Sequence, residues 1–145
     1  MSGGSPVAVA VIFVWLGMVL AISFLEAPLK FRAPNVTRQI GLGIGRLVFR
    51  ALNSIEVMFA AVVAAVIMVS PPPADVVAAF LTAFAMLATQ LIAVRPFLNR
   101  RSDRVLAGLN LPRSRGHYAY VGLEVVKVIA LVVAGVLLLS GHPPT

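Results

Sequence analysis

Two stretches of the chain carry no charged residue over a length that can cross a lipid bilayer. They comprise residues 6–25 and 76–94. At 1.5 Å per residue, a helix of about 20 residues spans the roughly 30 Å hydrocarbon layer. The whole chain is 60% hydrophobic and 12% charged, whereas a soluble domain is about half apolar. The sequence therefore predicts an integral membrane protein and excludes a disordered or collagenous chain.

Two further apolar runs are too short to cross the bilayer alone. Residues 57–70 and 128–139 would reach only about 21 and 18 Å as helices. Spanning helices must therefore begin earlier and carry Glu56 and Glu124 into the membrane. We expect an all-α fold, a four-helix membrane bundle that forms one domain over residues 1–145. The predicted spans are about 6–25, 48–70, 75–95 and 118–139.

Lysine and arginine lie almost entirely in the two loops after the first and third spans. We expect the protein in the cell (inner) membrane. By the positive-inside rule, these loops face the cytoplasm and both termini lie on the outer side. The net charge of +7 then indicates contact with anionic lipid headgroups and does not require nucleic acid. The expected headgroup contacts are Arg32, Arg46, Arg100, Arg101, Arg113 and Arg115.

The chain contains a weak internal repeat. Pro28 precedes Glu56 by the same interval as Pro96 precedes Glu124. This interval favours two tandem helical hairpins in one orientation, as in some small transporters. Chance convergence explains it equally well, because few non-apolar pairs support the alignment.

Polar residues inside the even-numbered spans form the candidate site. Glu56 and Glu124 occupy similar depths, so they could meet, and at least one of two close acids should hold a proton near neutral pH. Intramembrane ionisable residues favour a site for a cation, a proton or a small polar solute, open to the cytoplasm. The candidate residues are Glu56, Glu124, Lys127, Arg50, Asn53, Glu26, Gln90 and His117.

A purely structural interpretation of the same residues stays open. Glu124 would then pair with Lys127, and Glu56 with Arg50 or Asn53, to fix the register of the helices. Other residues have simple expected roles. Trp15 would pack in the first span, while Tyr118 and Tyr120 would lie in an interfacial aromatic belt. A glycine-rich segment, expected to be flexible or closely packed, would precede the second span and contains Gly41, Gly43 and Gly45.

Catalytic chemistry has little support in the sequence. The chain has no cysteine and only two histidines, so we expect no metal, haem or other cofactor. Asp75 and Asp103 fall on opposite sides of the membrane, so no nucleophile set is visible and we expect no enzyme. Two functions remain: binding or transport of an ion or small solute, or a non-catalytic accessory or scaffold role in a larger membrane complex. A homo-oligomer or a membrane-complex partner would accompany either function.

Several short motifs suggest a family. They are Leu16-Gly17, Ala27-Pro28 with Phe31, Gly45 and Phe49, and Gly116-His117. With them the chain resembles small four-helix bacterial membrane proteins of unknown function related to the eukaryotic cisplatin-resistance-associated transmembrane protein. It reads Val48-Phe49-Arg50 where that family has Phe-Pro-x-Tyr. The resemblance implies a four-helix bundle, no enzyme activity, and a link to the handling or trafficking of solutes.

Overall fold

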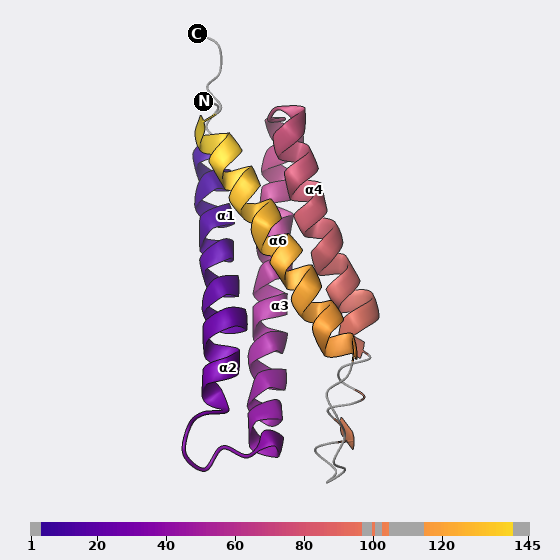
Figure 1. Ribbon diagram of the computed structural model, residues 1–145. Coiled ribbons are helices and arrows are strands. Elements are labelled where there is room, and N and C mark those ends of the chain that lie inside the picture. Colours follow the sequence, from indigo (N-terminus) through magenta and orange to yellow (C-terminus); the bar gives the residue numbers. More distant parts are fainter. Residues whose placement is uncertain (1–3, 97–99, 101–102, 105–114, 141–145) are drawn as a thin grey trace.

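The described residues form a bundle of helical rods (Figure 1). A computed structural model describes residues 4–96, 100, 103–104 and 115–140. Within these residues the chain contains helices and turns and no strand. The elements are α1 (Gly4–Val19), η1 (Leu20–Glu26), α2 (Ala27–Lys30), α3 (Arg38–Val69), α4 (Ala74–Thr89), η2 (Gln90–Val94) and α6 (Arg115–Ser140). The π-helical segments η1 and η2 continue α1 and α4 without a break.

Four rods in the described residues are long and apolar enough to cross a membrane. They are Pro6–Lys30, Arg38–Val69, Ala74–Val94 and Tyr118–Ser140. Large apolar side chains stay exposed on their outer faces, including Leu47, Met68, Leu81 and Ile92. Such a surface suits lipid and is far more apolar than a soluble monomer would expose. The prediction of an all-α, four-helix, multi-pass membrane fold is confirmed.

The third and fourth spans begin and end close to the predicted positions, but the first two differ. The first rod continues through Pro28 to Lys30. The second begins at Arg38, well before residue 48, so the glycine-rich segment is helical and lies inside α3. Thr37 explains this start, because its Oγ1 accepts a 3.1 Å hydrogen bond from the Ile40 backbone N–H and caps the helix.

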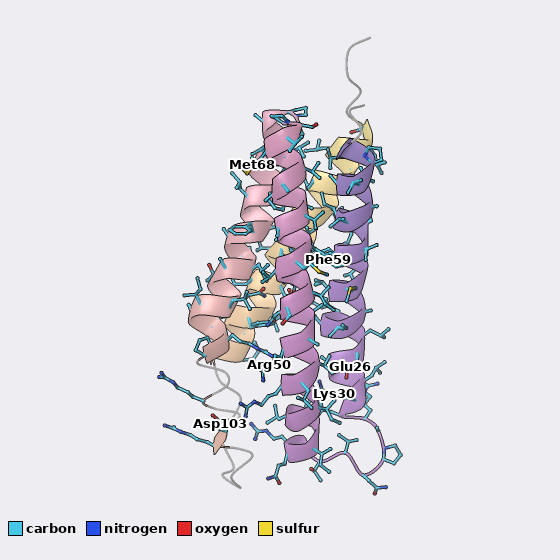
Figure 2. The ribbon with its side chains drawn as sticks, turned by 180° about the vertical axis from the view of Figure 1, so that it is seen from behind. Glu26, Lys30, Arg50, Phe59, Met68 and Asp103 are labelled. Atoms are coloured by element: carbon cyan, nitrogen blue, oxygen red, sulfur yellow. The ribbon has the colours of Figure 1, made fainter. Side chains whose placement is uncertain are left out.

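The rods pack mainly through contacts made by α1 and α6. Helix α1 packs against both α3 and α6, and α4 packs along α6, whereas α3 and α4 touch only briefly. Figure 1 shows α6 crossing obliquely in front of α3, from the upper end of α1 toward the lower end of α4, with the turn from α2 to α3 at the lower end. We call this the basic end of the bundle, because Lys30, Arg46 and Arg95 lie there. Figure 2 places Lys30 near that end and Met68 near the opposite one.

Each π-helical segment ends just before a proline. The Ala27 N–H donates to the Ile22 carbonyl, and the Arg95 N–H donates to the Gln90 carbonyl, so both bonds reach back five residues. Proline causes this shift, because its ring clashes with the carbonyl four residues earlier and it lacks an N–H of its own. The segments end at corresponding positions before Pro28 and Pro96.

Candidate functional site

Three ionisable side chains meet in the interior of the bundle. Glu56 and Lys127 are 0% exposed, and Glu124 is 1% exposed. Lys127 Nζ lies 2.5 Å from Glu56 Oε2 and 2.5 Å from Glu124 Oε1. One ammonium group therefore joins two carboxylates, and the set carries one formal negative charge in excess. We call Glu56, Lys127 and Glu124 the ionic cluster.

Neutral donors from the first rod also bind both carboxylates. Trp15 Nε1 donates a 2.8 Å hydrogen bond to Glu56 Oε2. Ser23 Oγ donates a 2.8 Å hydrogen bond to Glu124 Oε2. Hydrogen bonds to charged groups are stronger than those between neutral groups, so α1 and η1 are tied to α3 and α6 through the cluster.

Gln90 joins the cluster from the third rod. Its Oε1 accepts a 2.9 Å hydrogen bond from Lys127 Nζ. Its Nε2 donates to the Tyr120 carbonyl at 3.3 Å and to Glu124 Oε1 at 3.4 Å. All four rods thus contribute to one polar network that is closed off from the lipid.

The buried members of the network occupy the buried stripes of their own helices. Apolar core residues recur at spacings of three and four, the pattern of left-handed helix packing. Glu56 continues this pattern in α3, Gln90 continues it beyond α4, and Glu124 and Lys127 continue it in α6. The buried stripes are 8, 12, 15 and 19; 53, 56, 60 and 63; 76, 80, 83, 87 and 90; and 120, 124, 127, 131, 134 and 138.

One carboxylate oxygen of the ionic cluster lacks a hydrogen-bond partner within the described part of the chain. Glu56 Oε2 receives donors from both Trp15 and Lys127. Glu56 Oε1 is buried and has no hydrogen-bond partner among the described residues. Buried polar atoms without a partner are rare, so Glu56 Oε1 is the unsatisfied atom of the ionic cluster.

A cavity of about 200 Å³ approaches the cluster from the basic end. Glu124 and Ser23 form part of its wall, and the cations Lys30, Arg46 and Arg95 form another part. We call it the basic cavity. Its remaining lining is mainly apolar or aromatic: Phe24, Ala27, Phe31, Gly41, Leu42, Gly45, Phe49, Tyr120 and Val121.

Aromatic rings hold the cations of the basic cavity in place. The Arg95 guanidinium carbon lies 5.2 Å from the ring centroid of Phe49 and 5.8 Å from that of Tyr120. These two rings pack edge to face with centroids 5.9 Å apart. Lys30 Nζ lies 5.7 Å from the Phe49 centroid. These distances are within the range of cation–π attraction, so the positive charges are fixed on one wall.

Four of the residues predicted for the site meet in the network: Glu56, Glu124, Lys127 and Gln90. Asn53 is buried beside them, and its Oδ1 accepts a 3.5 Å hydrogen bond from the Tyr120 hydroxyl. Tyr120 is therefore a core residue, and its expected place in the aromatic belt is wrong, whereas Tyr118 is exposed.

The other predicted site residues lie elsewhere. Glu26 pairs with Lys30 at 3.7 Å and takes no part in the ionic cluster. Arg50 is exposed and lines an open groove beside α3. The pairing of Glu56 with Arg50 or Asn53 is thus wrong, because Lys127 from α6 reaches Glu56 instead. The side chain of His117 lies outside the described part of the structure.

The predicted headgroup contacts have mixed surroundings. Arg32 and Arg100 are exposed at the basic end, as expected for residues that meet lipid headgroups. Arg46 instead forms an ion pair with Asp103 and lines the basic cavity. Arg101, Arg113 and the side chain of Arg115 lie outside the described residues.

Sequence reasoning missed two contributors to the network, Trp15 and Ser23. Trp15 was expected to pack against apolar neighbours, and it does meet the Phe80 ring edge to face at 6.5 Å. Its indole N–H nevertheless serves Glu56. A signal for both was present in the sequence, because the stripe through residues 8, 12, 15 and 19 reaches residue 23 at its next step.

Comparison with known proteins assigns no function to the site. No family model, no curated protein and no solved structure matches the chain. The resemblance to the four-helix family therefore stays a prediction. What the protein does must be inferred from the ionic cluster and the basic cavity.

Proposed function

We propose that this membrane protein binds a small solute in the basic cavity and couples that binding to protonation of the ionic cluster. The observation that carries the proposal is the position of Glu124. Its carboxylate shares one ammonium with Glu56 and also borders the cavity. A solute in the cavity would therefore lie beside a carboxylate that belongs to a network with one excess negative charge.

The excess charge favours a proton. An unneutralised charge in the middle of a membrane costs about 2.5–3.5 kcal/mol on insertion scales. If Glu124 takes up a proton, Lys127 and Glu56 remain as a neutral pair and the cluster loses its net charge. The Ser23 hydroxyl suits this change, because it can donate to the charged carboxylate and accept from the protonated one. Glu124 is then the exchanging group and Glu56 the lasting partner of Lys127.

Access to the cluster is one-sided. On the far side of Glu56 the bundle is filled by apolar side chains, of which Ile12 and Leu131 are 0% exposed and Val63 is 1% exposed. The space left there is about 10 Å³, about the least that can hold one water molecule. Among the described residues, the basic cavity offers a solute a route to Glu124 from the basic end, which the positive-inside rule assigns to the cytoplasm. Transport would require the apolar layer to open while the basic end closes.

Proteoliposomes that contain a trapped pH-sensitive dye test this proposal. Small organic acids, amines and neutral solutes of similar size are added one at a time. At least one of these classes should change the internal pH when wild-type protein is present. Glu124→Gln should abolish the response, because the exchanging carboxyl is gone.

Glu26→Gln is the matched control. It removes a carboxylate from the same end of the bundle but outside the ionic cluster, so the response should persist. A wild-type protein that changes internal pH with none of the solutes, or a Glu124→Gln variant that responds like wild type, would contradict the proposal.

A further inference from the structure

We infer that the basic cavity selects a small amphipathic anion, namely a carboxylate or phosphate carried on an apolar or aromatic body. This inference rests on the proposed function and names the chemical class of its solute. Three features carry it: the charge of the cavity wall, the apolar character of the rest of the lining, and the position of Glu124.

In the described part of the chain, three cations and one carboxylate line the basic cavity, and two of the cations already have carboxylate partners. Arg46 is already paired with Asp103, and Lys30 has Glu26 at 3.7 Å. Arg95 is half-buried and has no carboxylate partner among the described residues, where its contacts are two aromatic rings. A guanidinium offers several N–H donors in one plane and binds carboxylate or phosphate through two of them. Arg95 is the cation left available for an anion.

The rest of the lining suits an apolar body. Phe24, Phe31, Leu42 and Val121 contribute aromatic and aliphatic surface around the cations. Gly41 lets the Phe31 ring pack closely against α3, because a Cβ atom there would clash with that ring. The volume of about 200 Å³ equals that of six or seven liquid water molecules at about 30 Å³ each. This is room for one ring with a short acidic arm.

The anion would also account for the link to a proton. Glu124 borders the same cavity, and a second negative charge beside it disfavours its ionised form. Binding of an anion would therefore bring a proton to Glu124, so that the two enter as a neutral pair. The affinity for the anion is expected to increase as the pH falls.

The anionic group could belong to a soluble solute or to a lipid. An open groove on the other side of α3, with a volume of about 680 Å³, contains Arg46, Arg50 and Arg95 and is a natural place for a lipid headgroup. The basic cavity is smaller and borders the ionic cluster, so we assign it to the soluble anion. The experiment separates the two sources through the lipid that surrounds the protein.

Calorimetric titration of the full-length protein in nanodiscs tests the inference. In nanodiscs of neutral phosphatidylcholine, phenylacetate and phenyl phosphate are the anionic probes. Phenethylamine and 2-phenylethanol match phenylacetate in shape but are cationic and neutral. At least one anion should bind, and neither matched probe should. The same titration in nanodiscs that contain anionic phosphatidylglycerol should give a similar affinity.

Variants of Arg95 test its part in binding the anion. Arg95→Gln should weaken anion binding by about 10- to 100-fold, the range of a hydrogen bond to a charged group. Arg95→Lys should lose less, because it keeps the charge. Arg100→Gln removes an exposed cation outside the cavity lining and should bind as wild type does. Circular dichroism of each variant checks that the helices are intact.

Several results would overturn the inference. They are equal binding of phenethylamine, unchanged affinity in a folded Arg95→Gln variant, and loss of anion binding in phosphatidylglycerol, which would show that a lipid headgroup fills the cavity. Failure of the two proposals is distinguishable. Anion binding without any pH response in proteoliposomes refutes proton coupling alone, whereas a pH response to amines with no anion binding refutes the solute class alone.

Discussion

The indole N–H of Trp15 donates a 2.8 Å hydrogen bond to Glu56, 41 residues away in the chain, and both side chains are fully buried. This bond joins α1 to α3 inside the membrane. Trp15 is also the one tryptophan of the protein, so tryptophan fluorescence arises next to the Glu56 carboxylate, which pairs with Lys127. The ionic cluster thus has a built-in optical reporter.

The bond between Trp15 and Glu56 should appear as an energetic coupling. Trp15→Phe and Glu56→Gln are each expected to lower stability, and together by less than the sum of the two. The coupling should be about 1.5–3 kcal/mol, as for a hydrogen bond to a charged group. Unfolding followed by circular dichroism measures it without tryptophan emission. Additive losses would mean that the contact contributes no stability of its own.

Removal of the shared ammonium should make stability strongly dependent on pH. Lys127→Met leaves two buried carboxylates without a cation, a change that costs about 3–5 kcal/mol when one partner of a buried pair is lost. Because protonation removes those charges, the folded variant binds protons that the unfolded chain releases, and its stability should increase as the pH falls. Thermal unfolding at several pH values measures this.

Lys30→Met is the control for that experiment. It removes a lysine whose carboxylate partner, Glu26, is partly exposed, so the loss should be small at every pH. A Lys127→Met variant as stable as wild type at neutral pH would show that the ammonium does not neutralise the cluster.

Two glycines of α6 should respond in opposite directions to the same substitution. A Cβ at Gly135 would lie 2.7 Å from the Phe13 ring of α1, whereas a Cβ at Gly122 would meet nothing within 4 Å. Gly122→Ala should stabilise the helix by about 0.5–1 kcal/mol. Gly135→Ala should instead cost about 1–3 kcal/mol through overpacking. Equal effects in thermal unfolding would be inconsistent with the close contact of α1 and α6.

The entry of both acids into the membrane could be predicted from the sequence, because it follows from the length of the apolar runs. The apolar runs after Glu56 and before residue 140 are too short to span a membrane, so both acids must enter it. Their partners could not be derived that way. Lys127 bonds to both acids, a choice that depends on how α6 lies against α3, and no spacing within one helix reveals that.

Arg50 shows the limit of the same reasoning. It lies on the Glu56 face of α3 by spacing, yet it is exposed, since α3 and α4 touch only briefly and the groove beside Arg50 stays open.

The early start of α3 was not predicted, and the reason is local. Thr37 caps the helix at a point where three glycines had suggested a flexible or closely packed segment before the span.

The most direct test of the central claim is the emission of Trp15 as a function of pH. The claim is that the cluster of Glu56, Lys127 and Glu124 takes up a proton. Wild-type protein and a Glu26→Gln control should show the same shift in emission wavelength or intensity as the pH falls, and Glu124→Gln should remove it. Emission that does not change with pH in the wild type, or that changes equally in Glu124→Gln, would contradict the claim.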